Sequence, residues 1–406
     1  MSNELLDEII TKPTVDQDGD SKKAEICAII AGATNQERDL YLNSSGVTDV
    51  TTGQKVTNDS IIAFFSCTKM MTAMSVLQLC DAGKVDLDVP AEKYIPELGL
   101  VGVVEEEMLD EDGSYIANPK PPATKVTIKH LLTHTAGFSY PFLSYEYSLL
   151  LQKNPTYNAV NPHISMFSNN HMPLIHEPGQ SWSYGYSYDW VGLIVERVSG
   201  MKLEEYMKKN IFEPAGMSSC TFHLKDSEKL VKLHGKSRDG SLKKMRGQGV
   251  DLDPAMDMGG QGCFGTVGDY LKFMRIWLNY GISPDTGKRF LKTETVEWAI
   301  KNHLALPASI SMETVANFMF DGEIEPDGFT LAGCAYSNNR LPTGRGEGSI
   351  YWSGLANVYF WIDFKNKIAG FWASQMFPIM KPECINAYIE FEKAIYDRHV
   401  SKKSKL

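Results

Sequence analysis

The chain has 406 residues, of which 43% are hydrophobic and 22% charged, a composition typical of a soluble globular protein with an ample core. Its formal net charge of −10 leaves no basic footprint for a nucleic acid or an anionic membrane surface, so neither partner is expected. No stretch reaches the apolar length of a membrane span, and the acidic N-terminus does not resemble a signal peptide.

The seven cysteines are scattered, odd in number and without CxxC spacing. This pattern favours reduced thiols in an intracellular protein over a disulfide framework or a zinc site.

The first part of the chain predicts a short helix followed by a β-hairpin. Residues 2–12 have the spacing of a short amphipathic helix. Residues 25–33 and 38–44 form apolar or alternating runs separated by Thr34-Asn35-Gln36, which predicts two paired strands.

The stretch from Phe64 to Cys80 predicts a serine delivered onto the first turn of an apolar helix that stops before Gly83. Ser66 and Lys69 are three residues apart and would share one helix face. A serine hydroxyl becomes a nucleophile when a neighbour takes its proton, and an amine in an apolar pocket can do so. The helix start adds N–H groups and a positive dipole end that favour an oxyanion.

Serine–lysine spacing alone is a weak signal. Ser199 and Ser241 also precede a lysine by three residues, but neither opens a long apolar helix. Ser66 is therefore the candidate nucleophile, although on spacing alone a solvated or structural serine is an equally good interpretation.

The middle of the chain predicts a region of broken helices. It begins after Val85, where proline becomes frequent, and the acidic run 105–112 is typical of a solvated loop rather than a metal site. Residues 138–176 are aromatic and irregular, and helices are predicted over 191–198 and 203–210.

The C-terminal part predicts strands and a closing helix. The glycine-rich run 259–262 lacks the dinucleotide and P-loop patterns, so it is interpreted as a loop of close backbone approach. The remaining predicted elements are a helix over 267–280, strands over 329–336, 348–353, 357–363 and 368–374, and a helix over 385–399. Strands at both chain ends and helices between them predict an α/β catalytic domain from residues 1–85 and 200–406, with an inserted, mainly helical domain over 86–199.

Several motifs follow one another in an order that resembles the serine β-lactamase-like superfamily. Within it, the chain is most similar to the family VIII carboxylesterases and the fungal transesterases of the lovastatin-biosynthesis type. The resemblance extends from about residue 25 to 375 and rests on Ser66-Cys67-Thr68-Lys69, the run 131–137, Glu177-Pro178-Gly179, Trp182-x-Tyr184-Gly185-x-Ser187-x-Asp189-Trp190, Pro214-Ala215-Gly216-Met217, Trp352-Ser353-Gly354 and residues 359–363.

The resemblance implies an antiparallel sheet flanked by helices and a catalytic set without metal or organic cofactor. Ser66 would be the acylated nucleophile, Lys69 its proton partner, and Tyr184 the general base for acylation and general acid toward the leaving group. The backbone N–H groups of Ser66 and Leu355 would form the oxyanion hole. Without the family order, a packed aromatic would be the preferred interpretation of Tyr184, whereas the family order favours catalysis. His134 is expected to be structural rather than a triad base.

The expected substrate-binding residues are Trp352, Ser353, Gly354, Tyr186 and Phe138. Family members that open β-lactams carry Lys or His at the position of Trp352 and Asn or Ser at that of Tyr186. A cation there grips the β-lactam carboxylate, which tryptophan cannot do. An aromatic cleft instead suits an uncharged, apolar acyl or alcohol group.

The expected function is acyl transfer from an ester or acyl thioester, through an acyl-enzyme, to water or to a hydrophobic alcohol. The alternatives are a β-lactamase or D-amino-acid peptidase-like hydrolase, and a non-catalytic binding member of the fold. The ending Ser404-Lys405-Leu406 predicts recognition by a peroxisomal import receptor, and otherwise a cytoplasmic protein; its alternative is a frayed basic tail.

Overall fold

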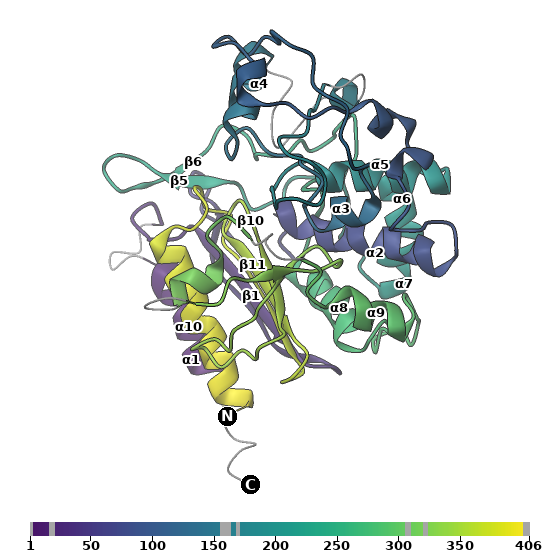
Figure 1. Cartoon of the computed structure of the whole chain (residues 1–406). Coiled ribbons are helices and arrows are strands. Elements are labelled where there is room, and N and C mark those ends of the chain that lie inside the picture. The colour runs from purple at the N-terminus through teal and green to yellow at the C-terminus, as the bar shows by residue number, and fades with distance from the viewer. Residues whose placement is uncertain are drawn as a thin grey trace.

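The computed structural model describes residues 3–15, 21–154, 164–167, 171–304, 310–319 and 324–400. Its centre is an antiparallel sheet of eight strands in the order β3-β2-β1-β12-β11-β10-β9-β8 (Figure 1). The strands are β1 (Ala28–Thr34), β2 (Asp39–Asp49), β3 (Gln54–Lys55), β8 (Gly328–Phe329), β9 (Ala335–Tyr336), β10 (Ile350–Gly354), β11 (Val358–Asp363) and β12 (Ile368–Ala373).

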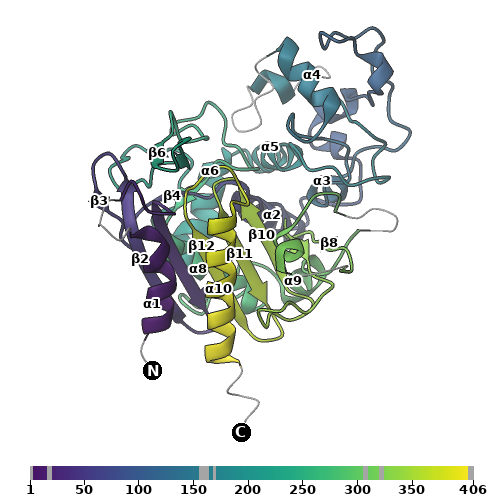
Figure 2. The same ribbon diagram turned by 90° about the vertical axis from the view of Figure 1, so that its left-hand side faces the viewer.

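Both ends of the chain build this sheet, as the sequence predicts. Strand β1 pairs with β2 on one side and with β12 on the other, where Ile30 lies opposite Ala373. All of β1 is buried, because helices cover both faces of the sheet. Helices α1 (Glu4–Thr11) and α10 (Pro382–His399) cover one face, and α8 (Val267–Leu278) covers the other (Figure 2).

The second layer of helices surrounds α2, the helix that follows Ser66. Residues from Thr68 to Leu77 are all buried, because α2 lies between the sheet and α5 and packs against α5 (Figure 1). The remaining helices are α2 (Thr68–Asp81), α3 (Ile128–Leu132), α4 (Tyr145–Lys153), α5 (Ser187–Ser199), α6 (Leu203–Met207), α7 (Glu213–Ala215) and α9 (Thr293–Ala299). In the part of the chain that the structure describes, no helix combines the length and apolar character that a membrane crossing requires.

Two short ribbons complete the architecture. Strand β4 (Ile62–Ala63) pairs with β7 (Phe264–Gly265) directly before the Ser66 turn, and β5 (His234–Lys236) pairs with β6 (Leu242–Lys244) in a projecting hairpin. The segment with α4 lies beyond α5, away from the sheet (Figure 1). The division into a catalytic and an inserted domain stays a prediction.

One predicted strand is wrong. Residues 329–336 were expected to form a single strand, but the chain reverses between β8 and β9, which pair with each other. Gly333 makes the reversal possible with a φ of +83°, a conformation that residues with a side chain rarely adopt. The backbone N–H of Thr330 donates to the carbonyl of Cys334 across the turn (2.9 Å).

A buried ion pair ties α10 to the loop between β9 and β10. Arg345 and Glu392 are both fully buried, with Nε 3.1 Å from Oε1. The hydroxyls of Thr343 and Tyr388 donate to the two oxygens of the Glu392 carboxylate (2.5 and 2.6 Å). The guanidinium also lies 4.6 Å from the centre of the Tyr351 ring. Among the described residues, the Glu392 carboxylate is the only one that forms an ion pair with the buried Arg345 guanidinium.

We predict that Glu392→Gln lowers the free energy of unfolding by about 3–5 kcal/mol, because it leaves the Arg345 charge buried without compensation. Urea unfolding followed by circular dichroism measures the change. The exposed neighbour on the same helix supplies the control, since Glu390→Gln should change stability by less than about 0.5 kcal/mol. Equal, small effects of both substitutions would contradict the prediction.

Candidate active site

Ser66 lies on a tight turn between a strand and a helix. Strand β4 ends at Ala63, a 3₁₀ turn covers Phe65–Cys67, and α2 begins at Thr68. Phe65 has a φ of +49°, a left-handed conformation that is costly for a bulky residue and that is concentrated at functional sites. The turn leaves Ser66 half-buried in the lining of a pocket, at the start of the helix, as the sequence predicts.

Lys69 is fully buried beneath Ser66. Its Nζ lies 3.1 Å from Ser66 Oγ and donates to the carbonyl oxygen of Gly260 (2.8 Å). The same nitrogen lies 4.6 Å from the centre of the Tyr184 ring, within reach of a cation–π contact. The amine is thus held against the serine by uncharged groups.

The buried carboxylate of Asp189 also belongs to this network. Its Oδ1 accepts from the backbone N–H of Gly260 (2.9 Å), the residue whose carbonyl holds Lys69. Burial raises the pKa of the Asp189 carboxyl to about 6, against the opposing effect of the Lys69 charge and the Gly260 N–H.

Tyr184 and Trp352 together form one wall of the pocket that Ser66 lines. Trp352 Nε1 donates to the hydroxyl oxygen of Tyr184 (2.9 Å), which fixes where the phenol points. The Tyr184 ring also packs against His134, with ring centres 4.6 Å apart. The phenolic oxygen keeps its own proton available for a further hydrogen bond.

The pocket around Ser66 is small and predominantly apolar. Its cavity volume is about 90 Å³, and of the described residues that line it none is charged. The lining consists of Phe65, Ser66, Tyr140, Phe142, Tyr184, Gln261, Met312, Trp352, Ser353, Leu355 and Ile379. Such a pocket accepts an uncharged group far more readily than an ion.

Most of the predicted site residues come together here. Ser66, Tyr184, Trp352, Ser353 and Leu355 all line the pocket, and Lys69 reaches Ser66 from below.

The remaining three predicted substrate-binding residues lie behind the lining. Tyr186 is fully buried and packs against Tyr140, and Phe138 is fully buried and packs against Trp190. A Cβ atom on Gly354 would lie 2.5 Å from the carbonyl oxygen of Phe64, so this glycine lets the end of β10 approach the Ser66 turn. All three therefore support the pocket from behind.

Six lining residues were not predicted as site residues: Phe65, Tyr140, Phe142, Gln261, Met312 and Ile379. Two signals could have found three of them, because Tyr140 and Phe142 belong to the aromatic segment and Gln261 to the glycine-rich run. Met312 and Ile379 carry no motif.

The glycine-rich run is a loop of close approach, as predicted. A Cβ on Gly260 would lie 2.9 Å from a carboxylate oxygen of Asp189, and one on Gly259 would lie 2.5 Å from the carbonyl of Tyr188. Thr72 on α2 donates to the Gly259 carbonyl (2.7 Å). The loop is thereby held between α2 and α5, where the Gly260 carbonyl accepts from Lys69.

His134 has the surroundings of a packing residue. It is fully buried, has a φ of +56°, and its ring lies against Trp182, Tyr184, Tyr188 and Phe329. Burial and the nearby Lys69 charge hold the pKa of His134 well below its usual range. The imidazole therefore stays neutral and supports the Tyr184 ring.

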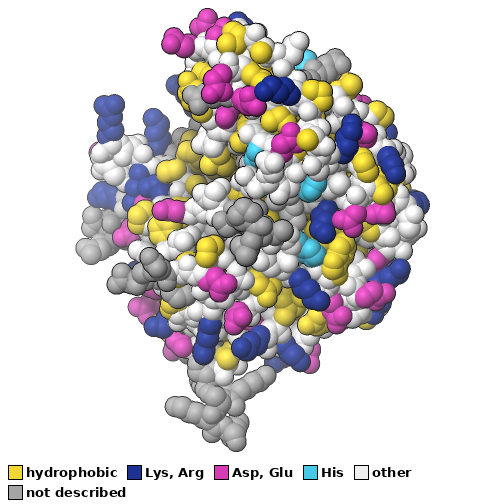
Figure 3. All heavy atoms as spheres, in the orientation of Figure 1, with side chains coloured by type: hydrophobic (Ala, Val, Ile, Leu, Met, Phe, Trp, Pro, Cys, Tyr) yellow, Lys and Arg dark blue, Asp and Glu magenta, His cyan; other side chains and the backbone are white. Residues whose placement is uncertain are grey.

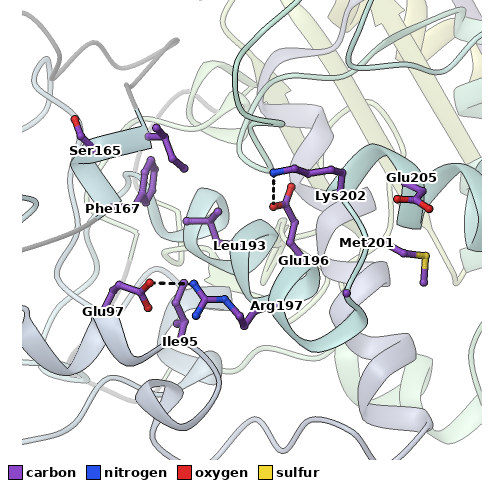
Figure 4. Close-up of a pocket in the computed structure, with 12 residues that line it drawn as sticks. Ile95, Glu97, Ser165, Phe167, Leu193, Glu196, Arg197, Met201, Lys202 and Glu205 are labelled. Carbon is purple, nitrogen blue, oxygen red and sulfur yellow. Dashed lines mark hydrogen bonds and ion pairs between the residues drawn. The ribbon is translucent and has the colours of Figure 1, made fainter.

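A larger hollow lies elsewhere, along α5 (Figure 4). Its volume is about 700 Å³, and four of its five charged lining side chains form two ion pairs: Glu97 with Arg197 (2.9 Å) and Glu196 with Lys202 (3.2 Å). Across the described residues, no group of three or more His, Cys, Asp or Glu side chains could hold a metal ion. The Ser66 pocket is therefore the candidate active site.

Three comparisons place these observations among known proteins. The Beta-lactamase family model matches residues 19–394. The chain is 29% identical to the monacolin J acid methylbutanoyltransferase of Aspergillus terreus, over 82% of this chain and 81% of that protein. It is also 29% identical to the lovastatin esterase of Penicillium rubens, over 86% and 88%.

The solved structures agree with this assignment. Simvastatin synthase (LovD) from Aspergillus terreus superposes with a TM-score of 0.81 and 25% identity, covering 98% of each chain. Because the family model spans most of the chain, and relatives and structure match over nearly its whole length, the protein belongs to the beta-lactamase family.

Proposed function

We propose that this protein transfers acyl groups from esters or acyl thioesters through an acyl-enzyme on Ser66. The observation that carries the proposal is the Lys69 Nζ to Ser66 Oγ contact (3.1 Å) on the floor of an uncharged pocket. A serine activated by an adjacent base is the arrangement that covalent acyl transfer requires.

Proton transfer would run between Ser66, Lys69 and Tyr184. In its neutral form Lys69 can donate one N–H to the Gly260 carbonyl and direct its lone pair at the Ser66 hydroxyl. As Ser66 Oγ bonds to the substrate carbonyl, its proton moves into this network, and Tyr184 protonates the departing alcohol or thiol. In the second half-reaction Tyr184 takes the proton from the incoming water or alcohol.

The oxyanion formed in each step would be held by the backbone N–H groups of Ser66 and Leu355. The close contact of Gly354 with Phe64 places the end of β10 beside the Ser66 turn, which supports this pairing of donors. The start of α2 contributes the positive end of its dipole.

The pocket supports an apolar acyl group as substrate. Trp352 occupies a position where a cation would bind the β-lactam carboxylate, and none of the described lining residues supplies another one. One relative is named a methylbutanoyltransferase and the other an esterase, which supports both an alcohol and water as acceptors. We therefore propose a transesterase that also hydrolyses its acyl-enzyme.

The ending Ser404-Lys405-Leu406 lies outside the described residues, and its interpretation as a peroxisomal address stays a prediction.

We predict that Lys69→Ala and Tyr184→Phe each lower kcat by about 10²-fold or more, the usual size of general acid–base assistance. The double variant should lose far less than the product of the two effects, because both residues handle the same proton. Steady-state hydrolysis of a p-nitrophenyl ester measures all three variants. Turnover of Tyr184→Phe at the wild-type rate would show that the phenol only packs.

We also predict that a hydrophobic alcohol competes with water for the acyl-enzyme. An apolar acceptor bound against Trp352 and Phe142 gains effective concentration by positioning and excludes water. The measurement incubates one acyl thioester with increasing alcohol and separates ester from free acid by chromatography. Ser66→Ala gives the uncatalysed background. Free acid as the only product, across the soluble range of several apolar alcohols, would make the enzyme a hydrolase and remove the transferase half of the proposal.

A further inference from the structure

A basic hollow of about 580 Å³ lies on the β5–β6 hairpin and the segment before α10. Five of its lining residues are cations and none is acidic: the lining is Gly235, Lys236, Lys243, Lys244, Met245, Arg246, Phe377, Pro378 and Lys381. The lining of this hollow is thus positively charged, although the chain as a whole has a formal net charge of −10. Figure 3 shows the blue side chains gathered over the hairpin that Figure 1 labels β5 and β6.

Nearby carboxylates neutralise only part of this charge. Glu383 pairs with both Lys236 (3.2 Å) and Lys381 (2.9 Å), and Asp49 pairs with Lys244 (2.7 Å).

The other two cations of the hollow, Lys243 and Arg246, are exposed, and neither takes part in an ion pair with a carboxylate among the described residues. The hollow therefore keeps a surplus of positive charge, which attracts an anion and increases its local concentration.

The basic hollow adjoins the active-site pocket along the chain. Phe377 and Pro378 line the hollow, and the next residue, Ile379, lines the pocket around Ser66. The two cavities therefore border the same short segment of chain at residues 377–379.

The hairpin is also fixed to the structure around the serine. Phe377 N–H donates to the carbonyl of His234 (2.7 Å), and Met245 N–H donates to that of Leu233 (2.8 Å). Farther along the same segment, a Cβ on Gly249 would lie 3.1 Å from the ring of Phe65. The basic hollow is thus held in place relative to the nucleophile.

The side chains of the hollow suit a phosphorylated nucleotide. Lysine and arginine bind phosphate oxygens through charge-assisted hydrogen bonds. Met245, Phe377 and Pro378 add an apolar and partly aromatic surface against which a flat heterocycle can pack. The volume lies within the range of small-molecule sites, about 300–1,000 Å³.

From these observations we propose that the basic hollow binds the phosphorylated nucleotide end of a coenzyme A thioester whose acyl end lies in the pocket at Ser66. This inference rests on the proposed acyl transfer and names its donor class. The neutral pocket cannot hold a polyanion, and the basic hollow offers no nucleophile of the Ser66 kind, so a donor with one neutral and one anionic end fits the pair of cavities. Ser66 Oγ bonds to the thioester carbonyl carbon, the carbon–sulfur bond breaks, and coenzyme A leaves as the thiol with the proton that the serine gave up.

The first test measures binding without any chemistry. Desulfo-coenzyme A, which has no sulfur to carry an acyl group, is titrated calorimetrically into the wild type and into the double variant Lys243→Glu/Arg246→Glu. We expect the dissociation constant to rise at least 10-fold in this variant and to rise with salt in the wild type. The control is Lys288→Glu/Lys365→Glu, which reverses two exposed charges outside the hollow and should bind like the wild type. Undetectable binding to the wild type, or equal binding to all three proteins, overturns the proposal.

The second test compares donors that differ only in the nucleotide. Butanoyl-coenzyme A and butanoyl-N-acetylcysteamine carry the same acyl group and thioester. We expect kcat/KM of the wild type to favour the coenzyme A thioester at least 10-fold, and the double variant to lose that preference while its rate with the short thioester is unchanged. Equal use of both donors by the wild type overturns the proposal. So does a double variant that is impaired only with the same acyl group on an acidic carrier protein, which would assign the hairpin to a protein partner.

The two proposals fail differently. If acyl transfer itself is wrong, neither thioester nor any aryl ester is turned over, whether or not desulfo-coenzyme A binds in the titration. If only the donor assignment is wrong, the short thioester and aryl esters are still turned over at Ser66, and the double variant behaves like the wild type with both thioesters.

Discussion

The burial of Lys69 is the constraint on which the rest of the site depends. A basic nitrogen without water around it needs polar partners, and the fold supplies the Gly260 carbonyl, the Ser66 hydroxyl and the face of Tyr184. The Gly260 carbonyl can reach Lys69 because Gly259 and Gly260 have no side chains, so their backbone fits closely between α2 and α5. Asp189 fixes that loop by accepting from the Gly260 N–H.

The same arrangement explains why the site needs segments that lie far apart in the chain. The α2 helix brings the serine and lysine, the segment before α5 brings Tyr184, and the sheet brings Trp352 through β10. The hydrogen bond from Trp352 to Tyr184 joins the sheet to the helical part within one wall of the pocket. A long antiparallel sheet closed by both chain ends gives β10 a fixed position, because β10 is inside the sheet rather than at its edge.

Much of this could be predicted from the sequence, for reasons that differ between residues. Ser66 and Lys69 could be predicted because helical spacing places residues three apart on one face. Tyr184, Trp352 and Leu355 could be predicted from the order of the family motifs. Tyr186 holds a position compared within the family motif, and Phe138 lies in the aromatic segment. A position in the chain does not say whether a ring faces the pocket or packs behind its lining. Met312 and Ile379 reach the pocket through tertiary packing alone and have no local pattern. The reversal at Gly333 interrupts an apolar run whose periodicity resembles a single strand.

The central claim is that Ser66 carries the acyl group. The most direct measurement is intact-protein mass spectrometry after mixing with a slowly deacylated p-nitrophenyl ester or acyl thioester, followed by peptide mapping. The account predicts a mass increase of one acyl group on the wild type, located on the peptide that contains Ser66, and none on a folded Ser66→Ala variant. A stoichiometric adduct on another residue, or an adduct that persists in Ser66→Ala, would contradict it.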